Sequence, residues 1–248
     1  MGNRIGYFEV GSADFETLVS FYRDLFGWQV AEVADGYALI DTRADRGIDG
    51  GIGRSRDGTP WVAFYVGVED PQAVLDRAAS LGGGGTVLPV TEIPGMGTFA
   101  MLADPDGSVV GLARTGGTAG PTGAAPSPGD GVPVDWFEVL GADAARTQRF
   151  YCDLFGWTVN ESGFPGYRLV DTRAGDGAIG GGLGGGGEAG RWATVYARVP
   201  DVEAALARAE RLGGSRVYGP NQVADHTYTG ALRDPSGNVF GVYAPRPQ

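Results

Sequence analysis

Two glutamates are the first candidates for chemistry in this sequence. Glu9 stands two residues after Tyr7, and Glu138 stands two residues after Trp136, each in a short apolar run. Side chains two apart on a strand share one face, so each carboxylate is expected beside an aromatic ring. A carboxylate in such surroundings can polarise a ligand or move a proton. His226 is the only histidine and therefore the only further base that titrates near neutral pH.

Each candidate also has a structural interpretation. Glu9 and Glu138 could form ion pairs with Arg43 and Arg173, because a carboxylate is costly to bury unless it is paired. The segment Asp41-Thr-Arg43 recurs later in the chain, and it is interpreted as a structural salt link. A histidine in a loop, such as His226, is more often exposed to solvent than catalytic.

Composition excludes several classes of function. The 248 residues carry 30 acidic and 19 basic side chains, a formal charge of −11. Nucleic acid and anionic membranes need a basic surface, so neither is expected as a partner. Every basic residue is Arg, which excludes a catalytic or phosphate-binding lysine. A single cysteine and a single histidine exclude a disulfide framework and a multi-histidine metal site.

The chain repeats itself. Phe21-Tyr-Arg-Asp-Leu-Phe-Gly-Trp28 recurs as Phe150-Tyr-Cys-Asp-Leu-Phe-Gly-Trp157, and Asp104-Pro-Asp-Gly107 recurs as Asp234-Pro-Ser-Gly237. The matches keep their order, as a duplicated domain requires. We therefore expect a first domain over 1–114, a Gly/Pro-rich linker over 115–133 and a second domain over 134–248.

Within each copy, the periodicity of the apolar residues predicts two βαβββ units. The first helix is expected to begin after Ser12 or Asp14 and to stop at Gly27, and Asp70-Pro71 is expected to open the second. The strands expected in the first copy are 5–10, 29–33, 37–42, 48–53, 61–68, 86–90, 98–103 and 108–113.

This layout, with its FYxxLFGW helix end and its DPxG turn, resembles the vicinal oxygen chelate superfamily. That group contains glyoxalases, bleomycin-resistance proteins and extradiol dioxygenases, and the chain is most similar to its duplicated, glyoxalase-like actinobacterial members. The resemblance implies an α+β fold of two tandem glyoxalase-like modules. In each module, two βαβββ units would form a curved mixed sheet, a cup over a ligand, with the helices outside.

The resemblance also implies where a metal would be held. Metal-dependent members place one ligand on each of four strands. The matching positions are Tyr7, Asp41, Ala63 and Gly111 in the first copy and Trp136, Asp171, Thr194 and Gly241 in the second. Each copy thus keeps one carboxylate where a divalent metal needs about three ligands. We expect no metal and no other cofactor.

Aromatic residues are expected to line the cups instead. Strand alternation places on this face Tyr7, Tyr37, Trp61 and Tyr65 in the first copy, and Trp136, Tyr167, Trp192, Thr194, Tyr196 and Tyr228 in the second. Such walls suit a flat, largely apolar ligand held by stacking. The same rings could also fill a closed barrel without a ligand. Trp28 and Trp157, just after the helices, are interpreted as core residues.

Three functions are compatible with these features. The favoured one is metal-independent binding, and sequestration, of a hydrophobic aromatic metabolite or antibiotic. The second is a metal-free isomerase, cyclase or lyase that uses Glu9, Glu138 or His226 as acid–base. The third, a metal-dependent lyase, isomerase or dioxygenase, lacks its ligands. We expect a small aromatic molecule as the partner, a monomer with a homodimer as the alternative, and a cytoplasmic location, because the sequence shows no signal peptide or spanning segment.

Overall fold

The structure is a computed structural model that describes residues 2–55, 57–115, 129–187, 190–223 and 227–245. The first copy contains β1 (Ile5–Ser12), α1 (Phe15–Phe26), β2 (Gln29–Ala34), β3 (Tyr37–Asp41), β4 (Gly50–Arg54), β5 (Trp61–Val68), α2 (Pro71–Ser80), β6 (Gly85–Ile93), β7 (Gly97–Ala103) and β8 (Val109–Arg114). The second copy contains β9 (Val134–Gly141), α3 (Ala144–Phe155), β10 (Thr158–Glu161), β11 (Arg168–Asp171), β12 (Gly180–Gly185), β13 (Trp192–Arg198), α4 (Val202–Arg211), β14 (Ser215–Gln222), β15 (Tyr228–Arg233) and β16 (Val239–Ala244).

The predicted order of two βαβββ units in each copy is confirmed. The strands of the first copy form one eight-stranded sheet in the order β2-β3-β4-β1-β5-β8-β7-β6, and those of the second copy repeat it as β10-β11-β12-β9-β13-β16-β15-β14. Both sheets are mixed, since β1 runs parallel to β4 and β13 parallel to β16, whereas hairpins such as β7–β8 are antiparallel. The fold is therefore α+β, with two tandem modules.

The helices begin and end where local sequence signals require. The Asp14 carboxylate accepts a hydrogen bond from the Thr17 N–H at 3.3 Å, and Asp143 caps α3 in the same way through Arg146 at 2.9 Å. Gly27 ends α1 in the left-handed conformation, with φ of 74°, which glycine adopts without a steric penalty.

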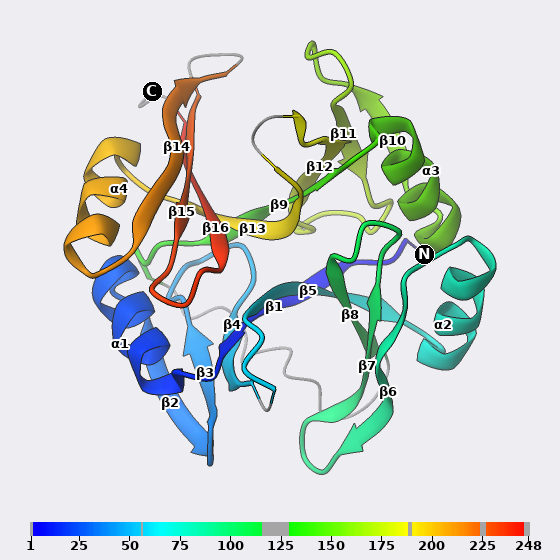
Figure 1. Cartoon of the computed structure of the whole chain (residues 1–248), viewed down its shortest axis with the longest axis horizontal. Helices are drawn as coiled ribbons and strands as arrows, with labels where there is room; N and C mark the ends of the chain where they lie inside the picture. The colour runs from blue at the N-terminus through cyan, green and yellow to red at the C-terminus, as the bar shows by residue number, and fades with distance from the viewer. Residues whose placement is uncertain (1, 56, 116–128, 188–189, 224–226, 246–248) are drawn as a thin grey trace. The chain divides into compact units, whose positions relative to one another are not determined.

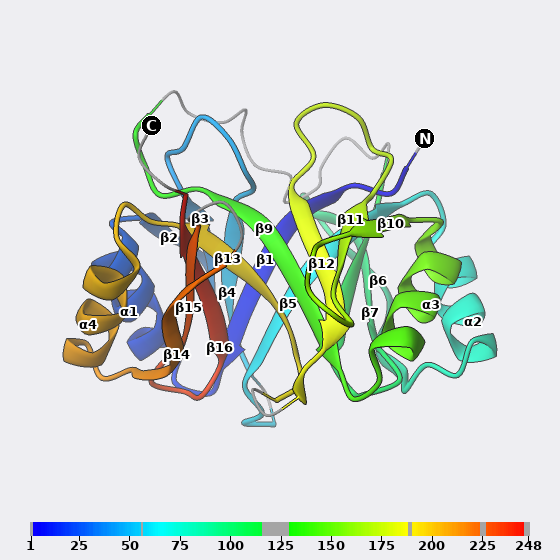
Figure 2. The ribbon, with the colours of Figure 1, turned by 90° about the horizontal axis from the view of Figure 1, so that it is seen from above.

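The described residues divide into two compact units, and each unit takes half of both copies. One unit contains α1 with β2–β4 from the first copy and α4 with β14–β16 from the second. The other contains α2 with β6–β8 and α3 with β10–β12. Both views show α1 beside α4 and α2 beside α3 (Figures 1 and 2).

The core of the unit that contains α1 and α4 is aromatic and joins the two copies. Phe8 lies 5.6 Å from Trp28 and 6.0 Å from Phe240, measured between ring centroids. Tyr22 stacks on Trp28 at 6.1 Å, and the indole N–H of Trp28 donates to the carbonyl of Val132 at 2.8 Å. The interpretation of Trp28 as a core residue is confirmed.

The unit that contains α2 and α3 is built in the same way. Phe137 packs between Phe64 and Trp157, at 5.1 and 5.3 Å, and Tyr151 stacks on Trp157 at 6.1 Å. The indole N–H of Trp157 donates to the carbonyl of Asn3 at 3.1 Å. Trp157 is therefore also a core residue, as predicted. None of the described helices is long and apolar enough to cross a membrane.

Candidate functional site

The predicted first-copy residues lie on β1, β3 and β5. Tyr7 and Tyr65 are buried, and their rings meet edge to face at 5.9 Å. Glu9 is also buried, with only 7% of its surface exposed, whereas Tyr37 and Trp61 are half-buried. Because Tyr7 and Glu9 are two apart on β1, they share one face, as the alternation predicts.

Trp61 lies against a pair of glycines. Gly11 on β1 and Gly53 on β4 are register partners, and a Cβ placed on Gly11 would overlap the Trp61 ring. The position that a Gly53 Cβ would take is 3.2 Å from Trp61 Cζ2 and 3.8 Å from Glu9 Oε1. The indole N–H of Trp61 is buried, and it has no hydrogen-bond acceptor among the described residues. Such an unmet donor costs roughly 1–3 kcal/mol.

The second copy holds the equivalent glutamate between two donors. The Tyr167 hydroxyl donates to Glu138 Oε1 at 3.0 Å, and the Trp192 indole N–H donates to Glu138 Oε2 at 3.0 Å. Three elements supply this cluster: Glu138 lies on β9, Tyr167 directly precedes β11, and Trp192 opens β13. Two donors fix the orientation of the carboxylate.

The hydroxyl groups of Tyr196 and Thr194 on β13 have hydrogen-bond partners within the fold. The hydroxyl of Tyr196 lies 3.1 Å from that of Tyr218 on β14, and the hydroxyl of Thr194 donates to the Val239 carbonyl at 2.7 Å. Tyr218 is a residue of this face that the sequence analysis missed. The irregular register of β14 against β15 breaks the simple alternation from which the face was predicted.

The donor set does not fit a metal ion. At the last of the four ligand positions that the resemblance implies in each copy, Gly111 faces Tyr65 and Gly241 faces Tyr196 as register partners. A Cβ on either glycine would overlap the tyrosine ring. The tyrosine ring thus fills the space that a side chain at this position would need. Among the described residues, no three His, Cys, Asp or Glu side chains lie close enough together to hold a metal.

The one carboxylate retained in each copy has a local structural contact. Asp41 accepts a hydrogen bond from the backbone N–H of Arg43 at 2.7 Å, and Asp171 does the same for Arg173 at 2.8 Å. Both arginines have left-handed backbones, with φ of 54° and 56°. The Asp side chain stabilises this unusual turn through a backbone hydrogen bond. The contact is structural, but it is not the salt link between carboxylate and guanidinium that the sequence predicted.

Other candidates lie apart from these clusters. His226 lies outside the described residues. Tyr228 opens β15 with 43% of its surface exposed, and Trp136 is half-buried on β9. Cys152 on α3 is half-buried, and burial raises the pKa of its thiol, which makes it a poorer nucleophile.

The two repeated motifs contact each other, and this pairing was not predicted. The Tyr22 hydroxyl of the first copy donates to Asp234 of the second at 3.1 Å, and the Tyr151 hydroxyl donates to Asp104 at 3.1 Å. Burial raises the pKa of both carboxyls and, more strongly, of both phenols. Asp104 also accepts from the N–H groups of Asp106 and Ser108. The FYxxLFGW and DPxG motifs therefore hold the fold together.

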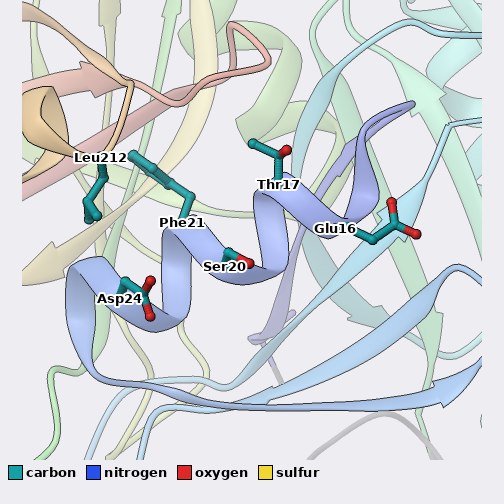
Figure 3. A pocket seen from close by; sticks show the side chains of 6 residues that line it. All are labelled: Glu16, Thr17, Ser20, Phe21, Asp24 and Leu212. Atoms are coloured by element: carbon teal, nitrogen blue, oxygen red, sulfur yellow. The ribbon is translucent and has the colours of Figure 1, made fainter.

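A shallow open groove lies on α1 and next to the end of α4. Figure 3 shows the side chains that line it: Glu16, Thr17, Ser20, Phe21, Asp24 and Leu212. Four of its six lining residues are polar or charged, and it contains none of the predicted site residues. Phe21 is its one aromatic lining residue, whereas the predicted binding site depends on several aromatic rings.

Comparison with known proteins agrees with this architecture. The model of the family described as the Glyoxalase/Bleomycin resistance protein/Dioxygenase superfamily matches residues 4–112 and again 134–242. The anthracycline biosynthesis protein DnrV of Streptomyces peucetius is 30% identical, over 95% of this chain and 91% of its own length.

Solved structures share the fold at low sequence identity. The Mn(II)-bound glyoxalase of Novosphingobium aromaticivorans aligns with a TM-score of 0.65 at 16% identity, covering 98% of this chain and 83% of that one. The 2,3-dioxygenase LapB of Pseudomonas sp. KL28 aligns with a TM-score of 0.66 at 17% identity, covering 100% and 95%. At such low sequence identity, these matches show a shared fold and nothing more.

Proposed function

Since the chain belongs to the glyoxalase/bleomycin resistance protein/dioxygenase superfamily, we propose that it binds a flat aromatic metabolite without a metal ion. The observation that carries the proposal is that aromatic rings fill the space at two of the expected metal-ligand positions. Tyr65 packs over Gly111 and Tyr196 over Gly241, at a position where the resemblance implies a metal ligand in metal-dependent members. Aromatic faces with a few polar groups bind flat ligands by stacking.

The class of ligand is supported by a relative. DnrV is named as an anthracycline biosynthesis protein, and anthracyclines are fused-ring aromatic compounds. We propose an aromatic compound of that kind as the partner of this chain. The formal charge of −11 and the buried Glu9 favour a neutral or cationic ligand over an anionic one.

Tryptophan fluorescence tests this proposal. The chain is titrated with a panel of aromatic polyketides, with and without EDTA, while the emission of its five tryptophans is recorded. We expect saturable quenching that EDTA does not change, and recovery of the compound intact by mass spectrometry and chromatography. Loss of binding in EDTA would refute metal independence, and absence of binding across the panel would refute the ligand class.

A metal-free acid–base enzyme is the second candidate, and the fixed geometry of Glu138 favours it. A carboxylate held by Tyr167 and Trp192 could remove a proton from a carbon next to a carbonyl and return it to another atom of the same molecule. No oxidant or further reactant is needed for such an isomerisation. An altered compound with unchanged mass, whose formation stops in E138Q or E9Q, would identify this activity.

A further inference from the structure

The two copies differ at the tryptophan that opens the second βαβββ unit. In the second copy, the indole N–H of Trp192 is bound to Glu138 at 3.0 Å. In the first copy, the N–H of Trp61 is buried and has no acceptor within the described part of the chain. The sequence aligns Trp61 with Trp192 and Glu9 with Glu138, so the difference arises from their surroundings.

One residue on the first strand of each copy explains the two positions of the indole. Gly11 in the first copy aligns with Leu140 in the second. Without a Cβ, Gly11 leaves room for the Trp61 ring, which lies over it and over Gly53. In the second copy two side chains occupy this place: a Cβ on Gly184, the counterpart of Gly53, would lie 2.7 Å from Tyr167 Cδ2 and 3.2 Å from Leu140 Cδ2.

A buried N–H without an acceptor is rare in folded proteins, because water has been removed and nothing replaces it. When such a donor lies at a candidate ligand site, a ligand oxygen is the acceptor that the fold does not supply. The glycines beneath Trp61 carry no Cβ, so its ring lies directly against the backbone of β1 and β4, and the residue as a whole is half-buried rather than enclosed. Trp192 has no such need, because Glu138 already satisfies it.

We propose that the first copy is the ligand-binding copy, that Trp61 donates its indole N–H to a carbonyl oxygen of the ligand, and that the second copy is closed by its own Glu138–Trp192 hydrogen bond. This inference rests on the proposed binding function and deepens it. The ligand is then an aromatic ketone or quinone, and one molecule binds per chain. Gly11 and Leu140 set the difference between the copies.

Two neutral probes of similar shape test the hydrogen bond. The first is 2-(hydroxymethyl)anthraquinone, which offers carbonyl acceptors, and the second is 2-(hydroxymethyl)anthracene, which has none on its rings. Calorimetry is expected to show one equivalent of the quinone per chain. W61F keeps an aromatic ring but removes the N–H, so it should weaken quinone binding roughly tenfold and leave anthracene binding nearly unchanged.

NMR of the tryptophan indoles assigns the binding copy. With ¹⁵N-tryptophan, the Trp61 and Trp192 signals are identified from the spectra of W61F and W192F. We expect the Trp61 N–H signal to move downfield when the quinone is added, as a new hydrogen bond forms, and the Trp192 signal to stay in place. These spectra also show whether each variant is folded.

The outcomes separate this inference from the function on which it rests. Absence of binding by both probes would overturn both. Three results would overturn the inference and leave aromatic binding intact. They are two equivalents of quinone bound per chain, a shift of the Trp192 signal alone, and an equal loss of affinity for the two probes in W61F. G11L places in the first copy the leucine that the second copy has at this position. Because the leucine side chain takes the space of the Trp61 ring, we expect G11L to abolish quinone binding. Unchanged binding would show that Trp61 does not depend on Gly11.

Discussion

At the scale of single residues, glycines decide where the aromatic rings lie. Tyr65 packs over Gly111 and Tyr196 over Gly241, and Trp61 lies over Gly11. A ring in van der Waals contact with the backbone leaves no room for a side chain beneath it. Glycine at these three positions therefore makes room for an aromatic ring against the backbone.

Adding a methyl group beneath Tyr65 should destabilise the protein. We expect G111A to lower the free energy of unfolding by roughly 1–3 kcal/mol, because the new Cβ overlaps the buried tyrosine ring. G185A is the matched control, since a Cβ there would meet its nearest neighbour, Ala144, at an ordinary 3.5 Å. Urea unfolding followed by circular dichroism compares the two, and equal stabilities would contradict the packing argument.

The buried Asp104 predicts a pH dependence of stability. Burial raises the pKa of this carboxyl, so the folded state binds its proton more tightly than the unfolded state. The protonated Asp104 carboxyl therefore adds to the free energy of unfolding. This contribution is fully present below the pKa of the group in the unfolded chain, near 4, and is lost as the pH rises through its pKa in the folded protein. We therefore expect the stability of the wild type relative to D104N to fall as the pH rises through the mildly acidic range.

D24N provides a control of opposite sign for this experiment. The hydrogen bond from Arg23 lowers the pKa of the exposed Asp24 carboxyl. The ionised Asp24 stabilises the fold above its pKa in the unfolded chain, and this stabilisation is lost as the pH falls through its pKa in the folded protein. The effect should be small because the Arg23–Asp24 pair is exposed. Urea unfolding at several pH values measures both variants. A pH-independent difference between wild type and D104N would show that burial does not shift this group.

At the scale of elements, each of α1 and α3 is attached to a turn of the other copy. Tyr22 on α1 reaches Asp234 in the turn before β16, and Tyr151 on α3 reaches Asp104 in the turn before β8. The turn aspartates also accept backbone N–H groups, as Asp234 does from Ser236 and Asn238. One carboxylate thus shapes its own turn and fixes a helix from a distant part of the chain.

Removing the Tyr22 hydroxyl should measure this attachment. We expect Y22F to lower the free energy of unfolding by about 1–2 kcal/mol, because a buried carboxylate loses one of its donors. Y228F, at an exposed tyrosine, is the control and should change stability by less than about 0.5 kcal/mol. A double-mutant cycle of Y22F with D234N should show coupling, and strictly additive losses would argue against a direct interaction.

At the scale of the whole molecule, the two copies are interdependent. Each compact unit combines half of the first copy with half of the second. Phe8 of the first copy packs on Phe240 of the second. The Trp28 N–H donates to the carbonyl of Val132, in the segment expected as the linker. A single copy therefore lacks part of each aromatic core.

Residues 1–114 expressed alone should not form a stable folded monomer. The fragment would expose Phe8 and Trp28 and would leave Asp104 without Tyr151. We expect an unfolded chain or a dimer that replaces the missing copy, and recovery of native near-UV circular dichroism when residues 134–248 are added. Light scattering and urea unfolding test this expectation, and a fragment that is monomeric and as stable as the full chain would contradict it.

Much of the fold could be predicted because its signals are local. The βαβββ order, the Asp14 and Asp143 caps and the stop at Gly27 depend on residues a few positions apart. The face that carries Tyr7, Glu9 and Tyr65 also followed from strand alternation alone. Strand ends were less accurate, as in β6, which runs on to Ile93 beyond the predicted 86–90.

The sequence by itself determined the duplication and the order of the elements, because these depend on residue types and on spacing along the chain. Tertiary structure alone decided how the copies combine, as in the Tyr22–Asp234 contact. It also decided that Trp192 meets Glu138 while Trp61 lies over Gly11 with an unmet N–H. The physical reason is that packing in three dimensions, through the space a glycine leaves or a leucine fills, selects among side-chain positions that the local sequence permits equally.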